Sequence, residues 1–87
     1  MLRSQLRHDL PELARIVALR DLPALRRWAH ATAGAFMIVR RKSIVGECRA
    51  LEALCDGSAG WTPATAAAAK ALQARLQRYM TAGEAAG

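Results

Sequence analysis

The residue with the most scope for chemistry in this chain is His30. An imidazole is partly unprotonated near neutral pH, so an exposed ring nitrogen can attack a phosphoryl group and later release it. On a helix, its neighbours three and four residues away are Arg26, Arg27, Ala33 and Gly34. The two arginines would offset the charge of a phosphoryl group. These residue types fit reversible phosphorylation of the imidazole.

Gly34 adds a second indication at the same place. A glycine inside a helix costs about 1 kcal/mol relative to alanine, and this chain uses alanine freely elsewhere. Gly34 lies one helical turn after His30. Without a Cβ at this position, a loop of another protein can approach the imidazole closely.

The sequence gives little indication of metal binding, ATP binding or disulfide formation. The two cysteines and two histidines match no metal-binding spacing, and no glycine-rich loop could hold the phosphates of ATP. We therefore expect no metal site, no cofactor and no kinase activity. Cys48 and Cys55 are two helical turns apart, about 10 Å, which is too far for a disulfide, so we expect both to be buried and reduced. His8 lies among charged residues near a helix start, where we expect no role beyond the surface.

Four segments have the apolar periodicity of helices. The first stays in register through Pro11, which favours a single kinked helix over a helix that begins at Asp9. Its face carries Leu2, Leu6, Leu10, Leu13 and Val17. The second is capped by Asp21, with Pro23 in its first turn. Its inward face carries Leu22, Leu25, Trp28, Ala29, Thr32, Phe36 and Val39, which leaves His30 toward solvent.

The second half of the chain continues the pattern. Ser43 is the predicted cap of a third helix, whose face carries Ile44, Cys48, Leu51 and Cys55. Residues 56–60 form a loop by composition, and Thr62 and Pro63 open a last helix. Its face carries Thr65, Ala68, Ala69, Leu72, Leu76 and Tyr79, and we expect residues 81–87 to fray. The short connections predict an all-α, up-and-down four-helix bundle, with residues 1–87 as one domain.

The composition of the chain restricts the kind of partner and the cellular location that we expect. Thirteen basic residues against seven acidic ones give a net charge of +6, which favours an acidic partner. No apolar run is long enough to span a membrane, and the sequence has no signal-peptide pattern. With two unpaired cysteines, this predicts a cytoplasmic protein.

The order of these features resembles the histidine-containing phosphotransfer (HPt) family. The segment LRRWAHATAGAF, residues 25–36, is similar to the family pattern A-H-x-L-K-G-[SA], in which the phosphorylated histidine precedes a glycine by four residues. Cys48, eighteen residues after His30, and the pair Leu51–Glu52 stand at the family's spacing. The resemblance covers roughly residues 6–80, and the last helix matches only in pattern.

The resemblance implies a phosphorelay intermediate. His30 would accept a phosphoryl group at Nε2 from an aspartate of a response-regulator receiver domain, which holds the Mg²⁺, and would pass it to another receiver. The domain would be free-standing or part of a hybrid sensor kinase. The receiver would dock on a surface that comprises Arg26, Arg27, Ala33, Gly34, Met37 and Arg41.

Three positions depart from the family pattern. Ala33 stands where the family has a lysine that accompanies the phosphoryl group, Thr32 replaces a leucine, and Arg40 replaces a frequent glycine. Either nearby arginines supply the missing charge, or the site is slow or degenerate. A lysine at position 33 would lie one turn from His30, and we expect the fold to accept it there.

Two other classes of function stay open. A helical adaptor or chaperone module could use the same bundle, with His30 incidental. A small basic nucleic-acid-binding protein is the third possibility, because six of the thirteen basic residues lie between Arg20 and Lys42. Against it, the chain has no helix-turn-helix spacing and no interleaved aromatics, so phosphotransfer is the favoured interpretation and nucleic acid is not an expected partner.

Overall fold

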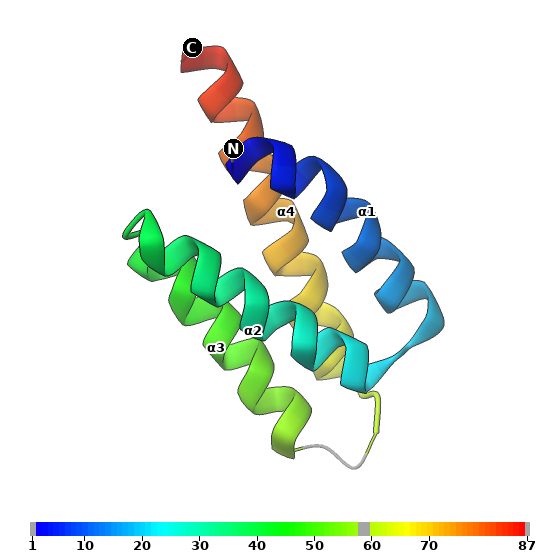
Figure 1. Cartoon of the computed structure of the whole chain (residues 1–87). Helices are drawn as coiled ribbons and strands as arrows, with labels where there is room; N and C mark the ends of the chain where they lie inside the picture. Colours follow the sequence, from blue (N-terminus) through cyan, green and yellow to red (C-terminus); the bar gives the residue numbers. More distant parts are fainter. Residues whose placement is uncertain (1, 58–59, 87) are drawn as a thin grey trace.

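The computed structural model describes residues 2–57 and 60–86, which form four helices and no strand. They are α1 (Leu2–Leu19), α2 (Leu22–Ile38), α3 (Lys42–Gly57) and α4 (Pro63–Ala86). Each helix packs against the next one in the chain, and α4 returns to α1 (Figure 1). The predicted up-and-down four-helix bundle is therefore confirmed. No helix in the described part of the chain is long and apolar enough to cross a membrane.

Two of the three predicted caps are confirmed. The Asp21 carboxylate accepts a hydrogen bond from the Ala24 amide at 3.2 Å, and the Thr62 hydroxyl accepts one from the Thr65 amide at 3.1 Å. Both therefore satisfy amides that the first turn of a helix leaves without partners. The third prediction is wrong, because α3 begins before Ser43.

Ser43 lies inside the first turn of α3. The Arg41 carbonyl, rather than a serine side chain, accepts the Val45 amide there at 3.0 Å. The Ser43 hydroxyl instead accepts a hydrogen bond from Arg75 of α4 at 2.6 Å. The residue predicted as a cap therefore links α3 to α4.

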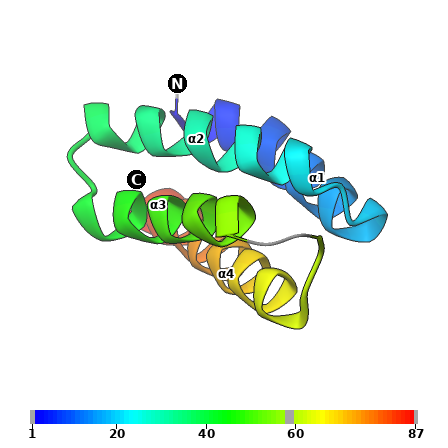
Figure 2. The ribbon, with the colours of Figure 1, turned by 90° about the horizontal axis from the view of Figure 1, so that it is seen from below.

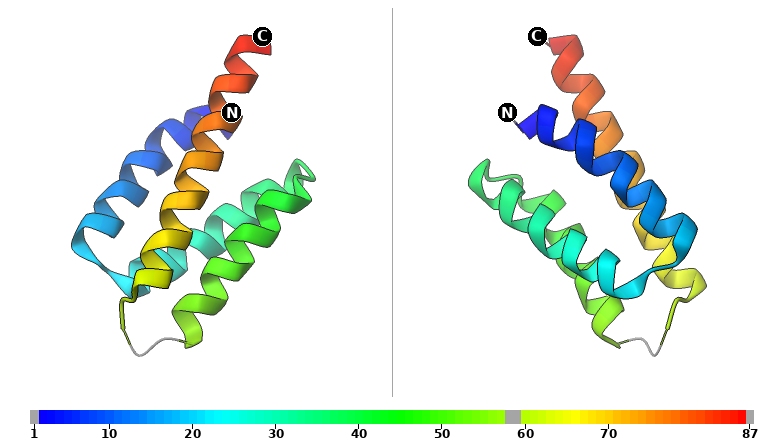
Figure 3. Two further views of the ribbon diagram at one scale, coloured as in Figure 1. Left: turned by 180° about the vertical axis from the view of Figure 1, so that it is seen from behind. Right: turned by 45° about the vertical axis from the view of Figure 1, so that its right-hand side comes forward.

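The two longest helices, α1 and α4, are both continuous. α1 runs through Pro11 without interruption, so the single-helix interpretation is confirmed. α4 is helical through Ala86 and projects beyond the neighbouring helices (Figures 1 and 3). The fraying expected from residue 81 is therefore not seen in the backbone of residues 81–86, three of which are alanine, the residue with the highest helix propensity. Gly87 lies outside the described residues.

The core follows the predicted faces, with changes in α1 and α2. Ile16 is buried in α1 while Val17 is only partly buried, and the Leu2 side chain lies outside the described part. Val39 is exposed because α2 ends before it. The predicted faces of α3 and α4 are confirmed, with Ala68 and Tyr79 partly buried.

One further change concerns α2, which runs side by side with α3 (Figure 2). Ala33 joins Ala29 among the fully buried residues of this helix. The two alanines are four residues apart and so share one face, where short side chains let neighbouring helices approach closely. The buried stripe of α2 is thus wider than the sequence predicts, and His30 lies beside it.

Candidate functional site

His30 projects from the middle of α2 into solvent. Its side chain is 69 % exposed, although the preceding residue, Ala29, is fully buried. The predicted exposure of His30 is confirmed, and its cause is the inward face of α2, which turns Ala29 and Thr32 toward the core. The imidazole is therefore accessible to another protein.

One edge of the exposed ring is held by α3. Nδ1 of His30 lies 2.9 Å from Oε1 of Glu52, whose side chain is only 15 % exposed. The other carboxylate oxygen, Oε2, accepts a hydrogen bond at 3.0 Å from Nη1 of Arg49, one turn earlier on α3. Glu52 thus connects the imidazole of α2 to a guanidinium of α3.

The charge of Glu52 determines which ring nitrogen carries the proton. The hydrogen bond from His30 lowers the pKa of Glu52, the Arg49 guanidinium lowers it further, and partial desolvation opposes both. Glu52 is therefore ionised at neutral pH and can only accept hydrogen bonds. A neutral His30 must then carry its proton on Nδ1, which leaves the lone pair on Nε2.

Arg49 also lies beside the ring itself. Its Nη1 is 3.4 Å from His30 Nδ1, but both atoms are donors in this arrangement, so the contact is not a hydrogen bond. Its Nη2 lies 3.7 Å from the sulfur of Met37. Arg49 therefore brings a positive charge to the imidazole and links it to Met37, two turns later on α2.

The structure brings two of the predicted partner-binding residues to this site. Gly34 is exposed one turn after His30, and a Cβ added there would meet nothing within 4 Å. Met37 is exposed and contacts Arg49. The clearance expected at Gly34 and the exposure expected at Met37 are both present.

The predicted arginines do not contact the ring. Arg26 forms an ion pair with Asp56, and Arg41 lies over the ring of Tyr79, 5.2 Å from its centroid. Arg27 is exposed on α2. The cation that lies beside the imidazole is Arg49, which was not singled out from the sequence.

The prediction that Ala33 belongs to the docking surface is wrong. Its side chain is fully buried, so it cannot form part of a docking surface. One turn of separation from His30 does not place position 33 on the exposed face of α2. The broad buried stripe of α2 includes position 33, and a lysine there would have to enter the packing around it.

Sequence reasoning identified Glu52 only as part of a family spacing and missed its contact with His30. Arg49 and Glu52 are three residues apart, which is the spacing of an ion pair on a helix surface. That signal was present in the sequence. What it could not show is the register between α2 and α3 that places this pair beside His30.

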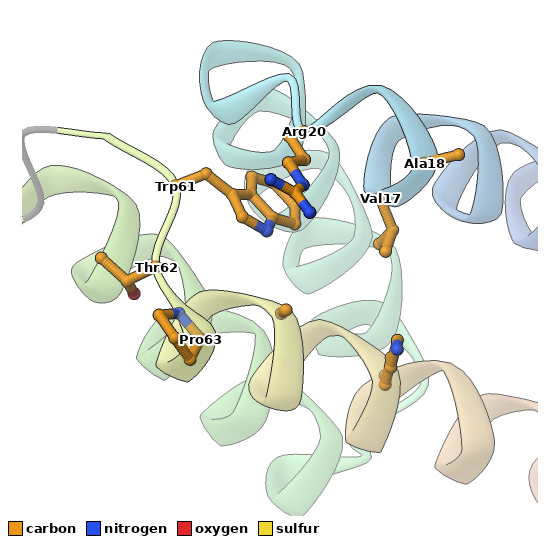
Figure 4. Close-up of a pocket in the computed structure, with 8 residues that line it drawn as sticks. Val17, Ala18, Arg20, Trp61, Thr62 and Pro63 are labelled. Carbon is orange, nitrogen blue, oxygen red and sulfur yellow. The ribbon is translucent and has the colours of Figure 1, made fainter.

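A hollow of about 440 Å³ lies apart from the histidine, between the end of α1 and the start of α4. It is lined by residues that include Val17, Arg20, Trp61 and Lys70 (Figure 4).

Within the described ranges, no three His, Cys, Asp or Glu side chains gather as a metal site would require. Both cysteines are free and buried, as predicted.

Comparison with protein families agrees with this geometry. The model of the Hpt domain family matches residues 1–82, nearly the whole chain. No curated protein and no solved structure matches. The family match implies histidine phosphotransfer in a phosphorelay, with receiver domains as the general class of partner. The chain, an all-α bundle with an exposed histidine on its second helix, belongs to the Hpt domain family.

Proposed function

We propose that His30 accepts a phosphoryl group on Nε2 from the aspartyl phosphate of one receiver domain and passes it to another. The observation that carries this proposal is the hydrogen bond between Nδ1 and Glu52 at 2.9 Å on a ring that is otherwise open to solvent. It holds the proton at the inner nitrogen and presents the nucleophilic nitrogen outward.

In the transfer step, each bond that forms is matched by a bond that breaks. The Nε2 lone pair forms a bond to phosphorus while the bond between phosphorus and the receiver's carboxylate oxygen breaks, and that electron pair stays on the carboxylate. His30 becomes an imidazolium that carries the phosphoryl group on Nε2 and its original proton on Nδ1. Transfer to the next receiver reverses these bond changes.

Glu52 and Arg49 suit the two charge states of this cycle. The Glu52 carboxylate faces the nitrogen that retains its proton, so it offsets the positive charge of the ring as the bond to phosphorus forms. Arg49 pairs with Glu52 and lies 3.4 Å from Nδ1, on the edge of the ring away from Nε2. Its positive charge balances the carboxylate and acts on the phosphoryl group only across the ring.

The partner supplies the remaining chemistry. A receiver domain would provide the acidic residues, the Mg²⁺ and the loops that surround the phosphoryl group, so this domain needs a nucleophile, clearance and a complementary surface. Gly34 gives that clearance, because its position is open on the exposed side of α2. The proposed mechanism requires no cofactor held by this domain, whether the domain is free-standing or part of a sensor kinase.

The test is transfer of labelled phosphate from a panel of receiver domains. We expect the wild-type protein to take up acid-labile label, His30→Gln to take up none, and His8→Gln to behave as the wild type because His8 lies apart on α1. Arg49→Gln should be slower by about tenfold, as expected for loss of about one charge-assisted interaction. Label in His30→Gln would overturn the proposal.

A further inference from the structure

The turn between α2 and α3 carries an apolar and basic surface, which we call the basic tip. It consists of Met37, Ile38, Val39, Arg40, Lys42 and Val45. Three of the exposed large apolar side chains of the described chain are here, with Ile38 83 % exposed and Met37 55 % exposed. Scattered single apolar residues are ordinary on a surface, whereas three consecutive exposed apolar residues near a functional site indicate an interaction surface.

Arg40 occupies a backbone conformation that favours glycine. Its φ is +59°, in the left-handed region, which costs an L-residue roughly 1–2 kcal/mol. Because glycine would relieve this strain, the arginine is not explained by the conformation of the turn. Its side chain provides a cation at the end of the bundle.

The charges of the basic tip are not neutralised by neighbouring acids. Neither Arg40 nor Lys42 forms an ion pair among the described residues, and Glu47, the first acidic residue of α3, pairs with Arg75 of α4. Between the two cations lies a hollow of about 510 Å³, which Met37 and Val45 also line. The surface therefore offers apolar contact with a positive rim.

The basic tip is continuous with the histidine site. Arg49 reaches the sulfur of Met37 with one nitrogen and the carboxylate of Glu52 with the other, and Glu52 holds His30. Met37 lies seven residues after His30, which is two turns along the same face of α2. A protein domain that covers Nε2 of His30 therefore meets the basic tip next.

We infer that the basic tip is a second docking region for the receiver domain, which would place apolar side chains against Met37, Ile38 and Val45 and acidic groups near Arg40 and Lys42. This inference rests on the proposed function, and the continuity with His30 favours a receiver over a membrane or a nucleic acid. Charge complementarity points the same way, because the receiver site proposed above holds its Mg²⁺ with acidic residues.

The turn between α1 and α2, which precedes the other end of α2, offers a matched control. Leu19 is 64 % exposed, and Arg20 follows it with φ of +52°, so this pair has the same chemistry and the same backbone strain as Ile38 and Arg40. The seventeen residues of α2 separate the two ends by about 25 Å. The affinity of a receiver that docks on the basic tip and His30 should therefore not change when Leu19 or Arg20 is replaced.

The experiment measures the rate of transfer against receiver concentration for Ile38→Ser, Arg40→Gly, Leu19→Ser and Arg20→Gly. For Ile38→Ser and Arg40→Gly we expect the receiver concentration at half-maximal rate to rise about five- to tenfold, with little change in the maximal rate. The two control variants should match the wild type. Arg40→Gly and Arg20→Gly should both melt at or above the wild-type temperature, since glycine relieves the strain.

A small-molecule phosphoryl donor distinguishes an effect on receiver docking from an effect on the reactivity of His30. Phosphoramidate gives its phosphoryl group to Nε2 and releases ammonia without any docking surface, so it should label wild type and all four variants at the same rate. An unchanged half-maximal concentration in Ile38→Ser and Arg40→Gly would overturn the docking inference, even with active wild type. A second outcome would also overturn it. If Ile38→Ser and Arg40→Gly lose binding to anionic phospholipid vesicles but transfer from the receiver at the wild-type rate, the basic tip is a membrane-binding surface. If neither phosphoramidate nor any receiver labels His30, the proposed function itself fails, and the inference fails with it.

Discussion

Oε1 of Glu52 lies 2.9 Å from Nδ1 of His30, although the two residues are 22 positions apart and belong to different helices. The contact exists because α2 and α3 run side by side, which brings the middle of one helix to the middle of the other (Figure 2). The orientation of the imidazole is therefore a property of helix packing as well as of α2.

Removal of the Glu52 carboxylate should release the proton of His30 from Nδ1. We expect Glu52→Ala to give a mixture of the two neutral tautomers and to slow phosphotransfer about tenfold, the effect of losing a charge-assisted hydrogen bond. Glu52→Gln should retain the Nδ1–H tautomer, because its amide oxygen still accepts, but should lose the charge. The measurement is the ¹⁵N chemical shift of the imidazole nitrogens, with Glu47→Ala as a control on the same helix. An unchanged tautomer in Glu52→Ala would contradict this role.

Gly34→Ala should separate stability from transfer. A Cβ at this position meets nothing within 4 Å, so alanine should raise the unfolding free energy by up to about 1 kcal/mol. Gly46→Ala on α3 is the control for that gain, because its Cβ also has open space. If Gly34 provides clearance, its variant should transfer from a receiver about tenfold more slowly despite its higher stability. Transfer at the wild-type rate would show that the missing Cβ has no part in docking.

Ala33→Lys should destabilise the protein rather than improve the site. Ala33 is fully buried, and a longer side chain there must displace its neighbours at a cost of about 1–3 kcal/mol, before any cost of the charge. For a domain of this size that cost lowers the melting temperature by at least about 4 °C. Ala31→Lys is the matched control, because Ala31 is exposed on the same helix. Equal melting temperatures for the two variants would contradict the burial of position 33.

The cysteines should make the protein sensitive to alkali. Burial raises the pKa of Cys48 from 9.0 to about 12 and also raises the pKa of Cys55. The folded state therefore favours the neutral thiol, so this contribution to stability is complete below pH 9 and is lost as the pH rises toward 12. The measurement is the unfolding free energy against pH for wild type and Cys48→Ala, in which the alkaline loss should be smaller. Identical alkaline profiles would contradict it.

The sequence predicted the local parts of this structure well. The caps at Asp21 and Thr62 and the exposure of His30 depend on spacing within one helix, and all three are confirmed. Ala33 was misplaced because its single methyl group fits an exposed face and a buried face equally well. Only the packing of α2 against its neighbours decides between them.

The partners of His30 were beyond the sequence for a related reason. Arg26 and Arg27 lie one turn from His30 on the same helix, so helical spacing favoured them as the cations of the site. In the structure Arg26 pairs with Asp56 of α3, while Arg49 of α3 reaches the ring. Which arginine contacts which acidic group depends on the register between α2 and α3 and on competition among several acids and bases. A single sequence shows neither.

The most direct test of the account is the position of the phosphoryl group on the imidazole. The protein, labelled with ¹⁵N in its histidines, is incubated with a phosphorylated receiver domain and observed by NMR. We predict a one-bond coupling between ³¹P and Nε2 of His30, with the proton retained on Nδ1 beside Glu52. A phosphoryl group on Nδ1 of His30, on His8, or on no histidine would contradict the account.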